Sequence, residues 1–122
     1  MKHSAEFLQI VQDARRRIQE CTAQEVRALQ ERGEAFHLID VREDHEYAAG
    51  HAQGAVHLGR GILERDIVGK IPDKNARIVL YCGGGFRSAL AVDNLQRMGY
   101  RRVLSLPGGI RALRDAGFTI EQ

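Results

Sequence analysis

One segment of the sequence joins a nucleophile to groups that stabilise negative charge. It consists of consecutive residues, Cys82, Gly83, Gly84, Gly85, Phe86, Arg87 and Ser88. The glycines let backbone N–H groups turn toward a common point, and such a nest at the start of a helix binds anions. Arg87 adds a positive charge, and Ser88 is a residue type that caps helices. These effects favour a thiolate, so we predict a nucleophilic Cys82 that acts on an anionic or polarised substrate.

The residues around this segment predict a parallel α/β sheet. The run Ile78–Tyr81 is apolar and β-branched at its start, as in a buried strand, and it leads directly into Cys82. From Ala89 to Met98 apolar residues recur at helical spacing, and Gly99 ends the pattern. Shorter strands are expected at 36–41, 55–58 and 103–106. Cys82 then lies at the carboxyl end of a strand, where open α/β sheets bind ligands.

The N-terminal residues predict a separate element. Residues 5–19 have the pattern of an amphipathic helix, and Thr22-Ala23-Gln24-Glu25 predicts a capping box that starts a second helix. We therefore expect an N-terminal helical extension over 1–20 and a domain over 21–122. Docking on that domain is the simplest role, because a helix of this length needs tertiary packing to persist. A protein partner or a second copy of the chain, giving a dimer, are the alternatives.

The composition is typical of one globular domain. The chain has 122 residues, of which 43% are hydrophobic and 28% charged, and its net charge is +2. This even balance does not indicate a nucleic-acid or membrane partner. No apolar run approaches the ~20 residues of a membrane span, and the signal-peptide pattern is absent. Cys21 and Cys82 do not form a CxxC pair. We expect a cytoplasmic protein with reduced thiols.

Several motifs share an order that is found in a known family. They are Asp40-Val41-Arg42-Glu43, Glu46-Tyr47, Gly50-His51, Gly54–Leu58, the Cys82–Ser88 loop and Gly108-Gly109-Ile110. Together they resemble the single-domain form of the rhodanese family, over about residues 22–120. The resemblance implies a rhodanese-like three-layer α/β/α fold, with a central parallel sheet of about four to five strands.

The resemblance also implies a reaction in two steps. Cys82 would take the outer sulfur of a small anionic donor such as thiosulfate, form a persulfide and release sulfite. A thiol, a protein acceptor or cyanide would then remove that sulfur. Residues 83–88 would bind the anion, and Asp40 and Arg42 would support the loop, although a surface ion pair is the alternative for these two. The mechanism requires no metal and no organic cofactor.

The sequence supports phosphatase activity and metal binding less well than sulfur transfer. Protein tyrosine phosphatases have one more residue between cysteine and arginine than the four between Cys82 and Arg87, so phosphatase activity is disfavoured. A persulfide carrier without turnover, or a protein-binding module, remains the alternative. His45-Glu46 begins like a zinc motif, but Ala49 replaces the second histidine. Gly83-Gly84 lacks the basic side chain of many thiosulfate-preferring members, and Leu113 stands where the family often has an aromatic residue. The donor therefore stays open.

Overall fold

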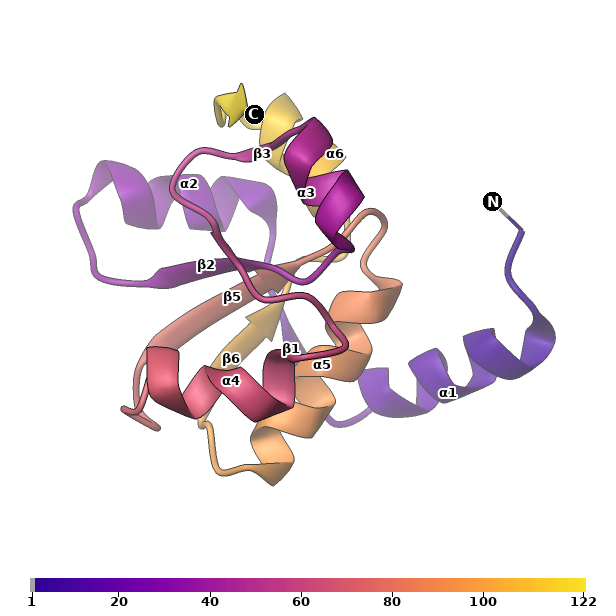
Figure 1. Cartoon of the computed structure of the whole chain (residues 1–122). Helices are drawn as coiled ribbons and strands as arrows, with labels where there is room; N and C mark the ends of the chain where they lie inside the picture. The colour runs from indigo at the N-terminus through magenta and orange to yellow at the C-terminus, as the bar shows by residue number, and fades with distance from the viewer. Residues whose placement is uncertain (1) are drawn as a thin grey trace.

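A central sheet of five parallel strands organises the computed structural model, which describes residues 2–122 (Figure 1). The strand order is β1-β6-β5-β2-β4. The strands are β1 (Gln19–Glu20), β2 (His37–Asp40), β4 (Val56–His57), β5 (Arg77–Tyr81) and β6 (Arg102–Ser105). Two further short strands pair antiparallel, namely β3 (His51–Ala52) and β7 (Ile120–Glu121). The predicted parallel α/β sheet is confirmed.

Helices cover both faces of the sheet and complete the three layers. They are α1 (Ala5–Arg15), α2 (Ala23–Glu31), α3 (Asp44–Ala49), α4 (Leu63–Lys70), α5 (Phe86–Arg97) and α6 (Gly109–Asp115). Figure 1 shows α4 and α5 on one side of the sheet and α2 and α6 on the other. Among residues 2–122, no helix combines the length and the apolar character needed to cross a bilayer.

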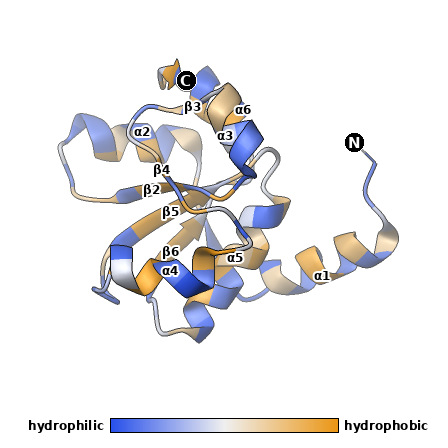
Figure 2. Cartoon of the chain, viewed as in Figure 1, coloured by the Kyte–Doolittle hydropathy of each residue, from blue (hydrophilic) through white to orange (hydrophobic). Residues whose placement is uncertain are grey.

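The two hydrophobic cores follow from the side-chain alternation along β5. Ile78 and Leu80 pack into the core under α4 and α5, whereas Val79 and Tyr81 pack into the core under α2 and α6. All four are fully buried. Figure 2 accordingly shows the hydrophobic colour along β5. A strand that is buried on both faces is held in place by both cores. It therefore fixes where the following loop begins, at the carboxyl end of the sheet.

The N-terminal helix docks on α5 (Figure 1). Its apolar face buries Val11 and Ala14, and just beyond the helix Arg17 forms a two-bond ion pair with Asp93 of α5, at 2.7 and 3.0 Å. The predicted docking is confirmed, and so is the capping box at the start of α2. The helix ends at Arg15 rather than residue 19 because the backbone of β1 pairs with β6. The expected boundary after residue 20 thus falls at the end of a strand of the sheet.

Candidate active site

Cys82 lies between the end of β5 and the start of α5. Its side chain is buried, and the N–H of Gly85 donates a hydrogen bond to its Sγ atom at 3.0 Å. The Ser88 Oγ atom lies 3.7 Å from the same sulfur. The sulfur also faces the N-terminus of a 12-residue helix, whose unpaired N–H groups create positive potential. Negative charge on this sulfur is therefore stabilised.

Two glycines with positive φ fix the shape of the Cys82 loop. Gly85 has φ +93°, and a Cβ atom there would lie 2.3 Å from the carbonyl oxygen of Pro107. Gly109 has φ +60°, and its Cβ would lie 2.3 Å from the carbonyl oxygen of Cys82. The same carbonyl accepts a hydrogen bond from the N–H of Ile110 at 3.0 Å. The loop before α6 therefore clamps the Cys82 loop, and any side chain at either glycine would force them apart.

Ser88 does not cap α5, contrary to the expectation from its type. The N-cap is Gly85, and Ser88 lies within the first turn of the helix. Its hydroxyl donates to the carbonyl oxygen of Gly85 at 3.2 Å and pairs with the Ser105 Oγ atom at 2.9 Å. Both serines are fully buried. Ser88 thus ties the Cys82 loop to the end of β6, which the sequence alone did not predict.

Arg87 is paired with Glu46 rather than held as a free cation. The guanidinium donates to both carboxylate oxygens, at 2.6 and 3.1 Å. The hydrogen bond from Arg87 is the main reason that the pKa of Glu46 falls to about 2. Arg87 also lies across the loop, because its Nη2 atom is 3.3 Å from where a Cβ of Gly83 would stand. The expected positive charge is present at the loop, but the Glu46 carboxylate balances it.

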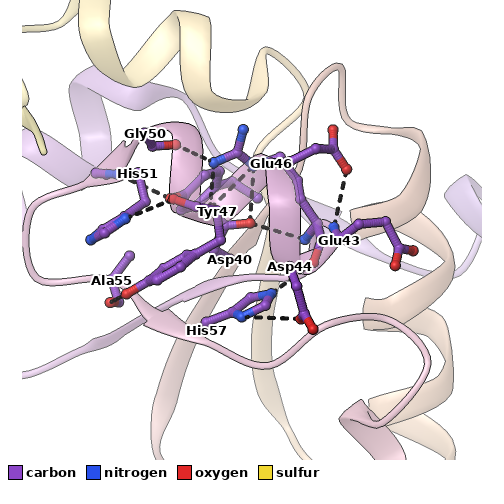
Figure 3. A network of polar contacts seen from close by, with 12 residues as sticks. Asp40, Glu43, Asp44, Glu46, Tyr47, Gly50, His51, Ala55 and His57 are labelled. Atoms are coloured by element: carbon purple, nitrogen blue, oxygen red, sulfur yellow. Dashed lines mark hydrogen bonds and ion pairs between the residues drawn. The ribbon is translucent and has the colours of Figure 1, made fainter. Parts of the chain in front are cut away.

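Asp40 and Arg42 form a buried pair rather than a surface pair. Asp40 is fully buried and Arg42 is 7% exposed. The guanidinium donates to Asp40 at 2.8 and 3.0 Å and to the carbonyl oxygen of Gly50 at 2.6 Å. Neither side chain contacts Cys82 Sγ within hydrogen-bonding distance. The pair instead joins β2 to the C-terminal end of α3, where Gly50 is the C-cap residue, and Figure 3 shows Asp40 and Gly50 in this network. Because α3 carries Glu46, this pair sets the position of the partner of Arg87.

An aromatic stack closes the other side of this network. Figure 3 shows the ring of Tyr47 between those of His51 and His57, at centroid distances of 3.8 and 4.5 Å. His51 Nδ1 lies 3.0 Å from the Tyr47 carbonyl oxygen, and His57 Nε2 lies 2.8 Å from that of Arg42. Since a carbonyl can only accept, each imidazole donates there. Both histidines hold backbone in place.

A pocket of about 880 Å³ opens over Cys82. Its lining includes Gly83, Gly84, Phe86 and Arg87 of the loop, His45 and Glu46 of α3, and Lys2, His3, Ser4 and Phe7 of the N-terminal segment. Phe7 falls within the amphipathic helix predicted over residues 5–19, without a predicted role at the site. Lys2 and His3 could not be predicted as site residues, because nothing in their types or spacing shows that this end of the chain reaches the loop.

Cys21 takes no part in this pocket. It lies in the core under α2 and lines a different pocket, of about 400 Å³, with Glu25 and Val26. Burial is the main cause that raises the pKa of its thiol to about 12, and the charges of Glu25 and Glu20 act in the same direction. A protonated, buried thiol is a poor nucleophile. Of the two cysteines, only Cys82 faces the pocket at the end of the sheet.

Comparison with known proteins places the chain in a family. The family model described as Rhodanese-like domain matches residues 22–116, so the chain belongs to the rhodanese family. Thiosulfate sulfurtransferase PspE of Escherichia coli K12 is 36% identical over 61% of this chain and 71% of its own. Putative sulfur carrier protein YrkF of Bacillus subtilis is 31% identical over 64% of this chain, but the match covers 41% of YrkF. This is a family of sulfur-transfer proteins.

A solved structure resembles the whole chain. It is a protein from Rhodopseudomonas palustris CGA009, described as of unknown function and a possible tyrosine phosphatase. It is 29% identical, with a TM-score of 0.81, and the match covers 99% of this chain and 98% of that one. The match therefore includes α1, which lies outside the residues matched by the family model.

Proposed function

We propose that the protein is a sulfurtransferase that carries sulfane sulfur as a persulfide on Cys82. The observation that carries the proposal is the position of Cys82 Sγ, which accepts the Gly85 N–H at 3.0 Å at the start of α5 and faces an open pocket. This position stabilises an anionic sulfur and leaves room for a second reactant. Membership of the rhodanese family and the similarity to PspE support the same chemistry.

In the first step the Cys82 thiolate attacks the outer sulfur of a donor such as thiosulfate. A bond forms between Sγ and that sulfur, and the bond from the outer sulfur to the sulfonyl sulfur breaks. Its electron pair leaves with sulfite, and the enzyme keeps a persulfide anion. The loop N–H groups and the start of α5 stabilise the charge where it develops.

In the second step a thiolate or cyanide attacks the terminal sulfur of the persulfide. The bond between the two sulfurs of Cys82 persulfide breaks, and Cys82 departs as a thiolate. The groups that stabilise the persulfide also stabilise this leaving thiolate, because both charges lie within the same loop. No proton or electron has to be supplied from elsewhere when the acceptor is already an anion.

The geometry favours sulfur transfer over phosphate hydrolysis. Four residues separate Cys82 from Arg87, so the loop is short for a tetrahedral phosphate. The guanidinium that a phosphatase would turn toward phosphate is held by Glu46 through two hydrogen bonds. The name of YrkF suggests that this relative carries sulfur. A carrier role for the present protein would use the same Cys82 persulfide as an enzyme, and would differ only in how the sulfur leaves.

Mass spectrometry of the intact protein tests the proposal. After incubation with thiosulfate, the wild type should gain one sulfur atom and lose it again with cyanide, whereas Cys82→Ser should gain none. Cys21→Ser is the matched control and should load like the wild type. Loading of Cys82→Ser would overturn the assignment, and so would a wild type that no sulfane donor loads. Release of thiocyanate over many cycles distinguishes turnover from carriage.

A further inference from the structure

A second groove lies between the Cys82 loop and α6. It has a volume of about 470 Å³ and is distinct from the larger pocket over Cys82, although Gly83 and Gly84 line both. The apolar part of its lining comes from Pro107 and Ile110, and the charged part comes from Arg111 and Arg114. We name this feature the α6 groove. It places two guanidinium groups next to the loop that carries the reactive sulfur.

Both arginines of the α6 groove are available to bind an anion. They are exposed and stand three residues apart on one helix, so their side chains lie on the same face. Among residues 2–122, no carboxylate lies within ion-pairing distance of either guanidinium, although Asp115 directly follows Arg114. Arg87, on the Cys82 loop, is by contrast held by Glu46 at 2.6 Å. The charge that Arg87 lacks for an outside partner is therefore present on α6.

The two cavities differ in their charge. Among residues 2–122, the Cys82 pocket is lined by the positive Lys2 and Arg87 and by the negative Glu46 and Cys82 thiolate. With neutral histidines these charges cancel, and they still cancel when Cys82 is a persulfide anion. The α6 groove has two positive charges and, among the residues described, no acidic side chain in its lining. The excess positive charge beside the loop thus lies entirely on α6.

The α6 groove holds a fixed position relative to the reactive sulfur. The N–H of Ile110 donates to the carbonyl oxygen of Cys82 at 3.0 Å, and Gly109 approaches the same carbonyl so closely that no Cβ fits. A partner bound by Arg111 and Arg114 would consequently be held at a constant distance from Sγ. The groove can therefore orient a partner for reaction as well as bind it.

We propose that the α6 groove binds acidic side chains of a protein that accepts the sulfur. This rests on the proposed function, because the sulfur comes from the Cys82 persulfide. The acceptor thiolate attacks the terminal sulfur and a bond forms between these two atoms. The bond from the terminal sulfur to Cys82 Sγ breaks, and its electron pair stays on Sγ. Carboxylates near the acceptor thiol pair with Arg111 and Arg114, since a guanidinium binds a carboxylate through two parallel hydrogen bonds.

The size and lining of the α6 groove favour a protein over a nucleic acid. Nucleic-acid binding draws on many phosphate contacts, whereas the groove offers two cations around Pro107 and Ile110. Arginine is enriched at protein interfaces, whose centres are apolar. Opposite charges at the rim of such an interface mainly speed the encounter of the partners, and salt screens this effect.

Transfer of sulfur to two peptides tests the groove. Each peptide has a central cysteine, flanked in one by four glutamates and in the other by four glutamines. The protein is loaded with thiosulfate and desalted, and mass spectrometry then follows the loss of its persulfide to each peptide. At low ionic strength, Arg111→Glu/Arg114→Glu should lower the ratio of the glutamate-peptide rate to the glutamine-peptide rate about tenfold, because repulsion replaces attraction. High salt should reduce this difference.

Arg97→Glu/Arg101→Glu is the matched control. Both arginines are exposed and line neither cavity, and Arg97 lies in the last turn of its helix, as Arg114 does. They lie far from the loop, because α5 begins beside the loop and ends at Arg97, and Arg101 precedes β6. Each Arg→Glu change subtracts two charges, so both double variants have a net charge of −2 instead of +2. The control should leave the ratio unchanged. An equal fall in both double variants, or no fall in Arg111→Glu/Arg114→Glu, would overturn the inference.

Binding of a peptide without a thiol separates this inference from the proposed function. The glutamate peptide with serine in place of cysteine cannot accept sulfur. In an NMR titration of the wild type, it should shift the amide signals of Arg111 and Arg114 more than that of Arg101. If it does so but no donor loads Cys82, the proposed function alone fails. If thiosulfate loads Cys82 but the peptide leaves the α6 signals unchanged, or an oligouridylate shifts them instead, the inference about the α6 groove alone fails.

Discussion

Arg87 and Glu46 come from segments 41 residues apart and meet at the rim of the Cys82 pocket through two hydrogen bonds, at 2.6 and 3.1 Å. One end of this pair belongs to the loop of the reactive cysteine. The other belongs to α3, which the buried Asp40–Arg42 pair connects to β2. A chain of polar contacts thus extends from the interior of the sheet to the loop.

This pair makes stability depend on pH in the acid range. The pKa of Glu46 is lowered from 4.5 to about 2, mainly by the hydrogen bond from Arg87. A lowered pKa means that the stabilisation is fully present above the unfolded value, near pH 4.5, and is lost as the pH falls toward 2. The melting temperature of Glu46→Gln should lie below that of the wild type at pH 7, and the gap should be smaller at pH 3.5. An equal gap at both pH values would show that the ion pair contributes no such stabilisation.

The shape of the Cys82 loop depends on Gly85 more than on Gly84. A side chain at Gly85 would clash with Pro107 and strain a backbone at φ +93°, whereas a Cβ at Gly84 would meet only the Phe86 ring at 3.9 Å. Gly85→Ala should cost roughly 1–3 kcal/mol of unfolding free energy and strongly reduce sulfur loading, while Gly84→Ala should change stability by less than about 0.5 kcal/mol. Urea denaturation and mass spectrometry measure both effects. Equal behaviour of the two variants would contradict the strain argument.

The sequence predicted the parts of the site that are contiguous in the chain. The strand, the glycines, Cys82 and Arg87 are neighbours in sequence, so their types and order indicate their chemistry. One local expectation, that Ser88 caps α5, was wrong for a physical reason. The N-cap of α5 is a glycine because the chain enters the helix with positive φ, and Ser88 instead bonds to Ser105. These outcomes depend on how closely the loops before α5 and α6 approach each other.

The sequence could not predict which side chains from distant segments come into contact. Glu46 was recognised as part of a motif, but its bonds to Arg87 depend on where α3 lies. The N-terminal helix was predicted from its periodicity and its docking from the need to bury an apolar face. That His3 and Phe7 then reach Phe86 depends on the angle at which α1 crosses α5, which no periodicity encodes.

The buried pair of Asp40 and Arg42 should matter far more than an exposed pair. Asp40→Ala removes the partner of a guanidinium that is 7% exposed, so an uncompensated charge stays buried. The expected loss is about 3–5 kcal/mol of unfolding free energy. Glu20→Ala is the control, because Glu20 pairs with Arg15 through side chains that are 32% and 45% exposed, and its loss should be about 0–1 kcal/mol. Similar losses in the two variants would show that water or another group compensates Arg42.

The buried contact between Ser88 and Ser105 should appear as a coupling between two mutations. Ser88→Ala leaves the Ser105 hydroxyl, which is fully buried, without its hydrogen-bond partner at 2.9 Å. An unsatisfied buried hydroxyl costs about 1–3 kcal/mol, so the single variant should lose that amount. The double variant Ser88→Ala/Ser105→Ala removes both polar groups and should lose less than the sum of the two single variants. Denaturant unfolding of all four proteins completes this cycle. Strict additivity would mean that the two hydroxyls do not stabilise each other, and that Ser88 acts on the Cys82 loop only through its contacts with the Gly85 carbonyl and with Cys82 Sγ.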